Sequence, residues 1–137
     1  MKHAALLSFL FLVTVIGCQV PPDRLPLRPL REDSQPLPYS ELLTRARLQS
    51  TAATEAFYVS RWTDLEDAAT GLEQSARFLG KAIEVPAKHK AIVASESSEL
   101  AAAAGKLREA AKAHRVKETN EILQRVNLIV RQLRPDA

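Results

Sequence analysis

The sequence predicts an all-α protein: an up-down-up-down four-helix bundle, preceded by a signal peptide and a proline-rich tether. Two observations carry this prediction. From Ser40 onward the chain is dominated by alanine, leucine, glutamate, lysine and arginine, which are good helix formers, and Pro86 is the one proline between Ser40 and Arg134. In the same region, apolar residues recur at alternating spacings of three and four, which is typical of helices that pack along a common seam.

The N-terminal element is a short basic start followed by an apolar run. Met1, Lys2 and His3 precede residues 4–16, which are apolar apart from Ser8 and Thr14. A helix of that length covers about 20 Å, which is too short for a hydrocarbon core of about 30 Å. The pattern therefore predicts a secretory signal, residues 1–17, and not a membrane span.

The single cysteine, Cys18, follows this run directly. The stretch Val15-Ile16-Gly17-Cys18 resembles the lipobox of bacterial lipoproteins. The resemblance implies cleavage before Cys18, a diacylglyceryl group on its thiol and an acyl chain such as palmitate on its amine. Two or more chains anchor a protein stably to a membrane. The expected location is the extracytoplasmic face of the cell membrane or of the outer membrane. The alternative is an ordinary secretory signal that ends near a cysteine.

Residues 18–39 are expected to be a lipidated cysteine and a linker. Residues 21–38 hold six of the eight prolines, so they cannot form a helix or a central strand. A polyproline-like spacer is expected, reaching about 65 Å from the bilayer and open to proteases. Arg24, Arg28 and Arg31 are interpreted as residues that solvate the tether, with contact to anionic headgroups as the alternative.

Residues 40–137 are expected to form the bundle. The apolar series that define its four helices are, in order: Leu43, Ala46, Ala53 and Phe57; Trp62, Leu65, Ala69, Leu72, Ala76, Leu79 and Ile83; Val93, Leu100, Ala103, Leu107 and Ala110, with Glu96 at one seam position; and Val116, Leu123, Val126, Val130 and Leu133.

Three breaks separate these series. A single helix over residues 40–83 would be about 66 Å long and would leave its seam uncovered, so we expect a break at residues 58–62. Residues 63–66, Thr-Asp-Leu-Glu, fit a capping box that would begin the second helix. Pro86 separates the second helix from a third over residues 87–113. His114 and Arg115 mark the last reversal.

The C-terminal series also bears on cofactor binding. The predicted architecture resembles the cytochrome c-prime family, whose last helix carries Cys-x-x-Cys-His followed by an aromatic residue and an arginine. Here Val126, Ile129 and Val130 stand at the haem-attaching and iron-ligating positions, and Leu133-Arg134 at the aromatic-arginine pair. The resemblance therefore implies a bundle of this shape without haem. It carries no function, because one fold serves many functions.

Other chemistry is sparsely represented. There is no HExxH, GxSxG, CxxC or phosphate-binding glycine loop, so we expect no enzyme, cofactor or metal site. His89 and His114 are interpreted as helix-end residues. The acidic cluster Asp64, Glu66 and Asp67 and a basic zone around the last turn of the third helix are interpreted as charges that complement helix dipoles. That basic zone comprises Lys106, Arg108, Lys112, Arg115 and Lys117. Nucleic acid is not an expected partner.

Trp62 is the single tryptophan and is expected in the core, with a partner or ligand surface as the alternative. The resulting hypothesis is a non-enzymatic lipoprotein of the cell envelope, anchored in the membrane and acting as an interaction or structural module with an unknown envelope protein. Two alternatives stay open. One is a bundle that binds haem, metal or a small apolar molecule. The other is a periplasmic chaperone-like binder with an exposed apolar groove.

Overall fold

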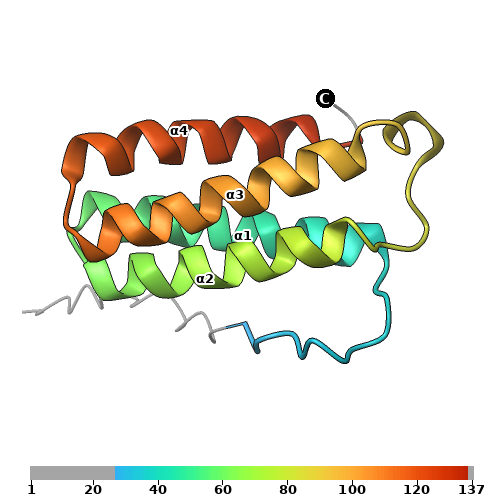
Figure 1. The fold of residues 1–137 in the computed structure, drawn as a ribbon, viewed down its shortest axis with the longest axis horizontal. Helices are drawn as coiled ribbons and strands as arrows, with labels where there is room; N and C mark the ends of the chain where they lie inside the picture. The colour runs from blue at the N-terminus through green and yellow to red at the C-terminus, as the bar shows by residue number, and fades with distance from the viewer. Residues whose placement is uncertain (1–26, 136–137) are drawn as a thin grey trace, which may run out of the picture.

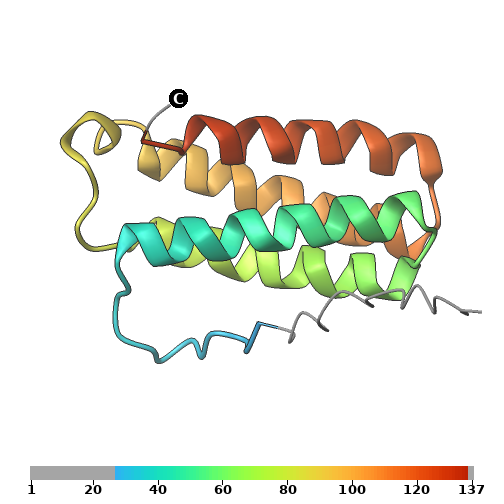
Figure 2. The same cartoon turned by 180° about the vertical axis from the view of Figure 1, so that it is seen from behind.

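The computed structural model describes residues 27–135, so the predicted signal peptide and Cys18 lie outside the described residues. Four helices follow one another: α1 (Tyr39–Tyr58), α2 (Trp62–Leu79), α3 (Val93–Lys112) and α4 (Val116–Gln132). They run up-down-up-down beside one another (Figures 1 and 2), which confirms the predicted all-α four-helix bundle. No helix within residues 27–135 combines the length and the apolar character that a membrane crossing requires.

The predicted seams form most of the core. Leucine and alanine positions of all four series are buried, and alanines let the helices approach closely. Two seam residues were predicted wrongly: Ile83 lies beyond α2 and is exposed, and Val116 is the exposed first residue of α4. Trp62, at the first position of α2, and Phe57, near the end of α1, are partly buried and pack against the core. Spacing along a helix does not show where the neighbouring helices stop.

The connection between α2 and α3 is longer than predicted. α2 ends at Leu79, and the backbone of Ile83 pairs with the linker: its N–H donates to Leu37 O (3.1 Å) and its C=O accepts from Tyr39 N (2.9 Å). A short 3₁₀ helix, η1 (Ala87–His89), follows Pro86, and α3 begins at Val93, six residues later than expected. The predicted capping box is also wrong, because α2 begins at Trp62 and no side chain caps it.

The two halves of the bundle are equivalent helical hairpins. Residues 39–79 have counterparts 54 positions later: Tyr39 corresponds to Val93, the turn residue Ser60 to His114, and Leu79 to Leu133. Most buried positions of one hairpin are buried in the other. The interface between α2 and α3, which joins the hairpins, is the most extensive one. The molecule is therefore built as a doubled hairpin.

The described part of the proline-rich linker is packed, contrary to the expectation of a free tether. Leu30 and Leu37 pack against the core, and the Leu30 N–H donates to Gln74 Oε1 (2.8 Å) while the Gln74 amide donates to Leu30 O. The side-chain amide of Gln74 thus satisfies both the N–H and the C=O of Leu30, as a neighbouring strand would. In Figures 1 and 2 this segment runs back from the start of α1 along the bundle, toward the opposite end.

Candidate functional site

Two reverse turns, residues 59–61 and 113–115, close the same end of the bundle, and we call residues 58–62 and 112–117 the turn end. In each turn one residue adopts the left-handed region, Ser60 (φ 57°) and His114 (φ 52°). The hydrogen bonds also match: Arg61 N donates to Ala56 O (2.8 Å) and Arg115 N to Ala110 O (3.0 Å). Both turns are Schellman motifs, in which non-glycine residues occupy the position that usually takes glycine.

An aromatic stack joins the two turns. The rings of Trp62 and His114 lie 4.9 Å apart and nearly parallel, at 14°. Phe57 meets the Trp62 ring edge-on, with centroids 6.2 Å apart at 83°. A shallow depression of about 430 Å³ lies beside the stack, lined by residues 60–64 and His114. Because Trp62 is half-buried, its indole is held by its neighbours on one side and meets solvent on the other.

Exposed apolar side chains surround this stack. Tyr58 is 76% exposed, Val59 60% and Val116 58%. Of the large apolar side chains exposed within residues 27–135, these three share the turn end, Ile83 and Ile92 lie in the loop at the opposite end, and Leu48 and Leu128 lie on helix faces. A cluster of this kind is more informative than a scattered apolar residue, because contiguous apolar surface marks contact sites.

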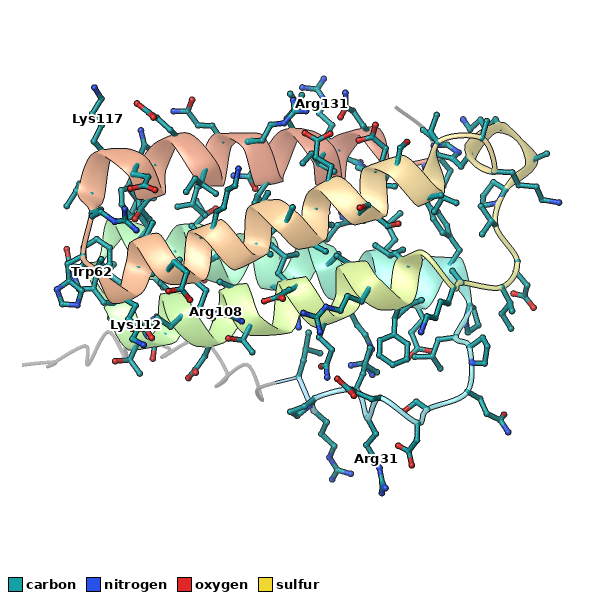
Figure 3. All side chains as sticks on the ribbon, viewed as in Figure 1. Arg31, Trp62, Arg108, Lys112, Lys117 and Arg131 are labelled. Carbon is teal, nitrogen blue, oxygen red and sulfur yellow. The ribbon has the colours of Figure 1, made fainter. Side chains whose placement is uncertain are left out.

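The charges at the turn end are mainly cationic. Arg61 pairs with Asp64 (3.1 Å) and Arg115 with Glu118 (2.9 Å). Lys112 and Lys117 are exposed and have no carboxylate within ion-pair distance among residues 27–135. Figure 3 shows both lysines at the same end of the bundle as Trp62. The turn end therefore combines an aromatic and aliphatic centre with two lysines that have no ion-pair partner in the described part of the chain.

Some residues of the two predicted charge clusters form ion pairs, and others are exposed on the surface. Within the basic zone, Arg108 donates to Glu73 (2.6 Å) and so joins α3 to α2, and Arg77 pairs with the same carboxylate. Lys106 is exposed on α3. In the acidic cluster, Asp64 serves the ion pair with Arg61, while Asp67 is exposed.

The two histidines have different environments. His114 is exposed in its turn, whereas His89 is buried in η1, 6.1 Å from the Tyr39 ring, and its Nδ1 has no partner in the described part of the chain. The expectation that His89 lies at the end of a long helix is therefore wrong. Burial raises the pKa of the Tyr39 hydroxyl, which donates to Leu133 O. No three potential metal ligands gather among residues 27–135.

The positions compared with haem-binding residues are part of the core. Val126, Ile129 and Val130 are buried between the helices, and so is Leu133, while Arg134 is exposed. These side chains pack in the same cluster as Tyr39 and Leu100. Their role in this chain is to fill the bundle.

Sequence reasoning missed two pairings. The first is the stack of His114 on Trp62, although the 54-residue spacing of two similar hairpins would have placed both turns at one end. The second is the contact between Leu30 and Gln74, for which neither residue type gives a signal.

Comparison with known protein families, with curated proteins and with solved structures found no match.

Proposed function

We propose that this chain is a lipid-anchored protein of a bacterial cell envelope, in which the helical bundle serves as a non-enzymatic interaction or structural module. One observation carries the proposal: the stretch Val15-Ile16-Gly17-Cys18 directly follows a basic start and an apolar run that is too short to span a membrane. The single cysteine lies at the position where a lipoprotein signal is cleaved and acylated. Two or three acyl chains at Cys18 hold the protein on the membrane.

The geometry of the bundle supports the non-enzymatic part of this proposal. Leucine, valine and alanine side chains fill the interior, and the buried Ser50 hydroxyl donates to Asn127 Oδ1 (2.6 Å). The conspicuous exposed features are side chains suited to contact, namely those of the turn end. These features are those of a surface that binds another surface.

The test is metabolic labelling of the full chain in a bacterial host. With radioactive palmitate, the wild-type chain should incorporate label, and an inhibitor of the lipoprotein signal peptidase should leave a longer precursor. Cys18→Ser should abolish both effects. The matched control is Ser8→Cys combined with Cys18→Ser, which restores a cysteine at a position where no lipobox precedes it. Equal labelling of the Cys18→Ser chain would refute lipidation at Cys18.

A further inference from the structure

The packed linker shortens the reach of the tether. Leu27 is the first described residue and stands nine positions after Cys18. An extended chain covers at most about 3.3–3.6 Å per residue, so this stretch reaches about 30 Å. The bundle itself is about 30 Å long, as given by the 20 residues of α1. A chain anchored at Cys18 therefore keeps its bundle close to the membrane, and not about 65 Å away as the full linker would.

The direction of the linker favours one end of the bundle. Leu30 is fixed to Gln74, which lies twelve residues after Trp62 on α2 and so about 18 Å from the turn end. From there the described linker points toward the turn end and away from the loop of residues 80–92 (Figures 1 and 2). About 30 Å of chain covers the distance to either end of the bundle, so it is the direction of the described linker, and not its reach, that favours the turn end.

The side chains of the turn end match the chemistry of that surface. Tyrosine and tryptophan favour the boundary between headgroups and acyl chains, where one edge of the ring is apolar and the other is wet. Tyr58 and Trp62 supply these rings, Val59 adds an exposed aliphatic side chain, and Lys112 and Lys117 supply exposed cations. At the opposite end the aromatic rings of Tyr39 and His89 are buried.

We propose that the turn end docks on the headgroup region of the same bilayer that holds Cys18, and that it prefers anionic phospholipids. The inference rests on the proposed lipid anchor. The anchor supplies proximity, and the turn end determines orientation: the helices stand on the membrane, and the loop of residues 80–92 faces away from it. A single attachment at Cys18 would leave the bundle free to turn, whereas the second contact fixes which surface meets partners.

Trp62 allows a direct test, because it is the single tryptophan. The purified full-length lipoprotein is reconstituted into vesicles of phosphatidylcholine with phosphatidylglycerol, or of phosphatidylcholine alone, each with brominated acyl chains. We expect bromine to quench Trp62 emission, more strongly in the anionic vesicles, and salt of about 1 M to weaken the effect by screening. Each lysine near an anionic surface strengthens association about fivefold, so Lys112→Glu with Lys117→Glu should lower the docking constant about 25-fold or more.

The matched control is Lys88→Glu with Lys90→Glu, the same change in charge in the loop at the opposite end, which should leave quenching unchanged. Tyr58→Ser with Val59→Ser, at positions that are exposed in the fold, should reduce quenching without loss of helicity. A chain that stays on the vesicles in high salt but shows no quenching of Trp62 overturns the docking proposal. A chain that leaves the vesicles in high salt lacks its anchor and overturns the proposed function instead.

Discussion

Tyr39 ties the beginning of α1 to the end of α4. Its ring is buried beside His89, and its hydroxyl donates a hydrogen bond to the backbone oxygen of Leu133. That oxygen belongs to the last turn of the bundle, where helix carbonyls have no partner within their own helix. No pattern in the sequence singles out Tyr39, because it precedes the apolar series and follows a proline. Its role depends on a contact between two residues that are 94 positions apart in the sequence.

Removing this hydroxyl should change both stability and its dependence on pH. Tyr39→Phe leaves a buried carbonyl without its donor, which should lower the free energy of unfolding by about 1–2 kcal/mol. Burial raises the pKa of Tyr39 above its ordinary value of 10.0, so the unfolded chain loses its proton first as pH rises. The contribution of Tyr39 is therefore complete below about pH 10 and is lost above it.

Urea unfolding measured at neutral pH and at about pH 10–11 checks this prediction. The wild-type chain should lose stability across this range more steeply than Tyr39→Phe. Tyr58→Phe is the control, because Tyr58 is largely exposed and should behave as the wild type. Identical alkaline slopes for the wild type and Tyr39→Phe would contradict the assignment.

At the scale of the helices, periodicity predicted which residues face the core but not where each helix ends. Leu65, Ala69, Leu72 and Leu79 are buried as their spacing indicates. α2 nevertheless stops before Ile83, because the backbone of Ile83 hydrogen-bonds to the linker and Glu84 adopts a positive φ of 58°. These hydrogen bonds join Ile83 to a segment more than forty residues away in the sequence, so the local spacing of apolar residues could not predict them.

The linker contact can be tested on the full chain. Gln74→Ala removes both hydrogen bonds to Leu30 and should loosen the segment around Leu30, while the backbone pairing of Leu37 with Ile83 stays. At about 1 kcal/mol for each bond, trypsin should cleave after Arg31 at least about tenfold faster, as followed by mass spectrometry. Gln124→Ala, at an exposed position of α4, is the matched control. If the wild-type linker is already cleaved as fast as that of Gln74→Ala, the packed linker does not exist in solution.

At the scale of the whole molecule, the up-down-up-down order followed from four amphipathic helices and short connections. That order already places the two turns at one end, but the stack of His114 on Trp62 was not predicted, because helix spacing does not show which side chains of two turns touch. The doubled hairpin explains their meeting: equivalent turns of two equivalent hairpins lie at the same end when the hairpins pack side by side. The candidate surface is therefore a property of the assembled bundle.

The same assembly should make the two hairpins unfold as one unit. Each hairpin buries its apolar face mainly through the interface of α2 with α3, which the ion pair of Arg108 with Glu73 also crosses. A hairpin separated from its partner would expose that face, and isolated helices of this length are marginal in water. We therefore expect one urea transition, with the same midpoint by Trp62 fluorescence and by far-UV circular dichroism.

Whether the hairpins unfold together can be tested by a substitution in the second hairpin whose effect is measured by Trp62 fluorescence in the first. Ile129→Val removes one buried methylene from α4, away from the turn end, and should lower the free energy of unfolding by about 0.5–1.5 kcal/mol. Trp62 lies on the first hairpin, yet its transition should shift by the same amount as the helical signal. Leu128→Val is the control, since Leu128 is exposed on the same helix and should shift neither. If the helical signal moves while the Trp62 midpoint stays, the hairpins unfold separately, and the turn end could then come apart without loss of the second hairpin.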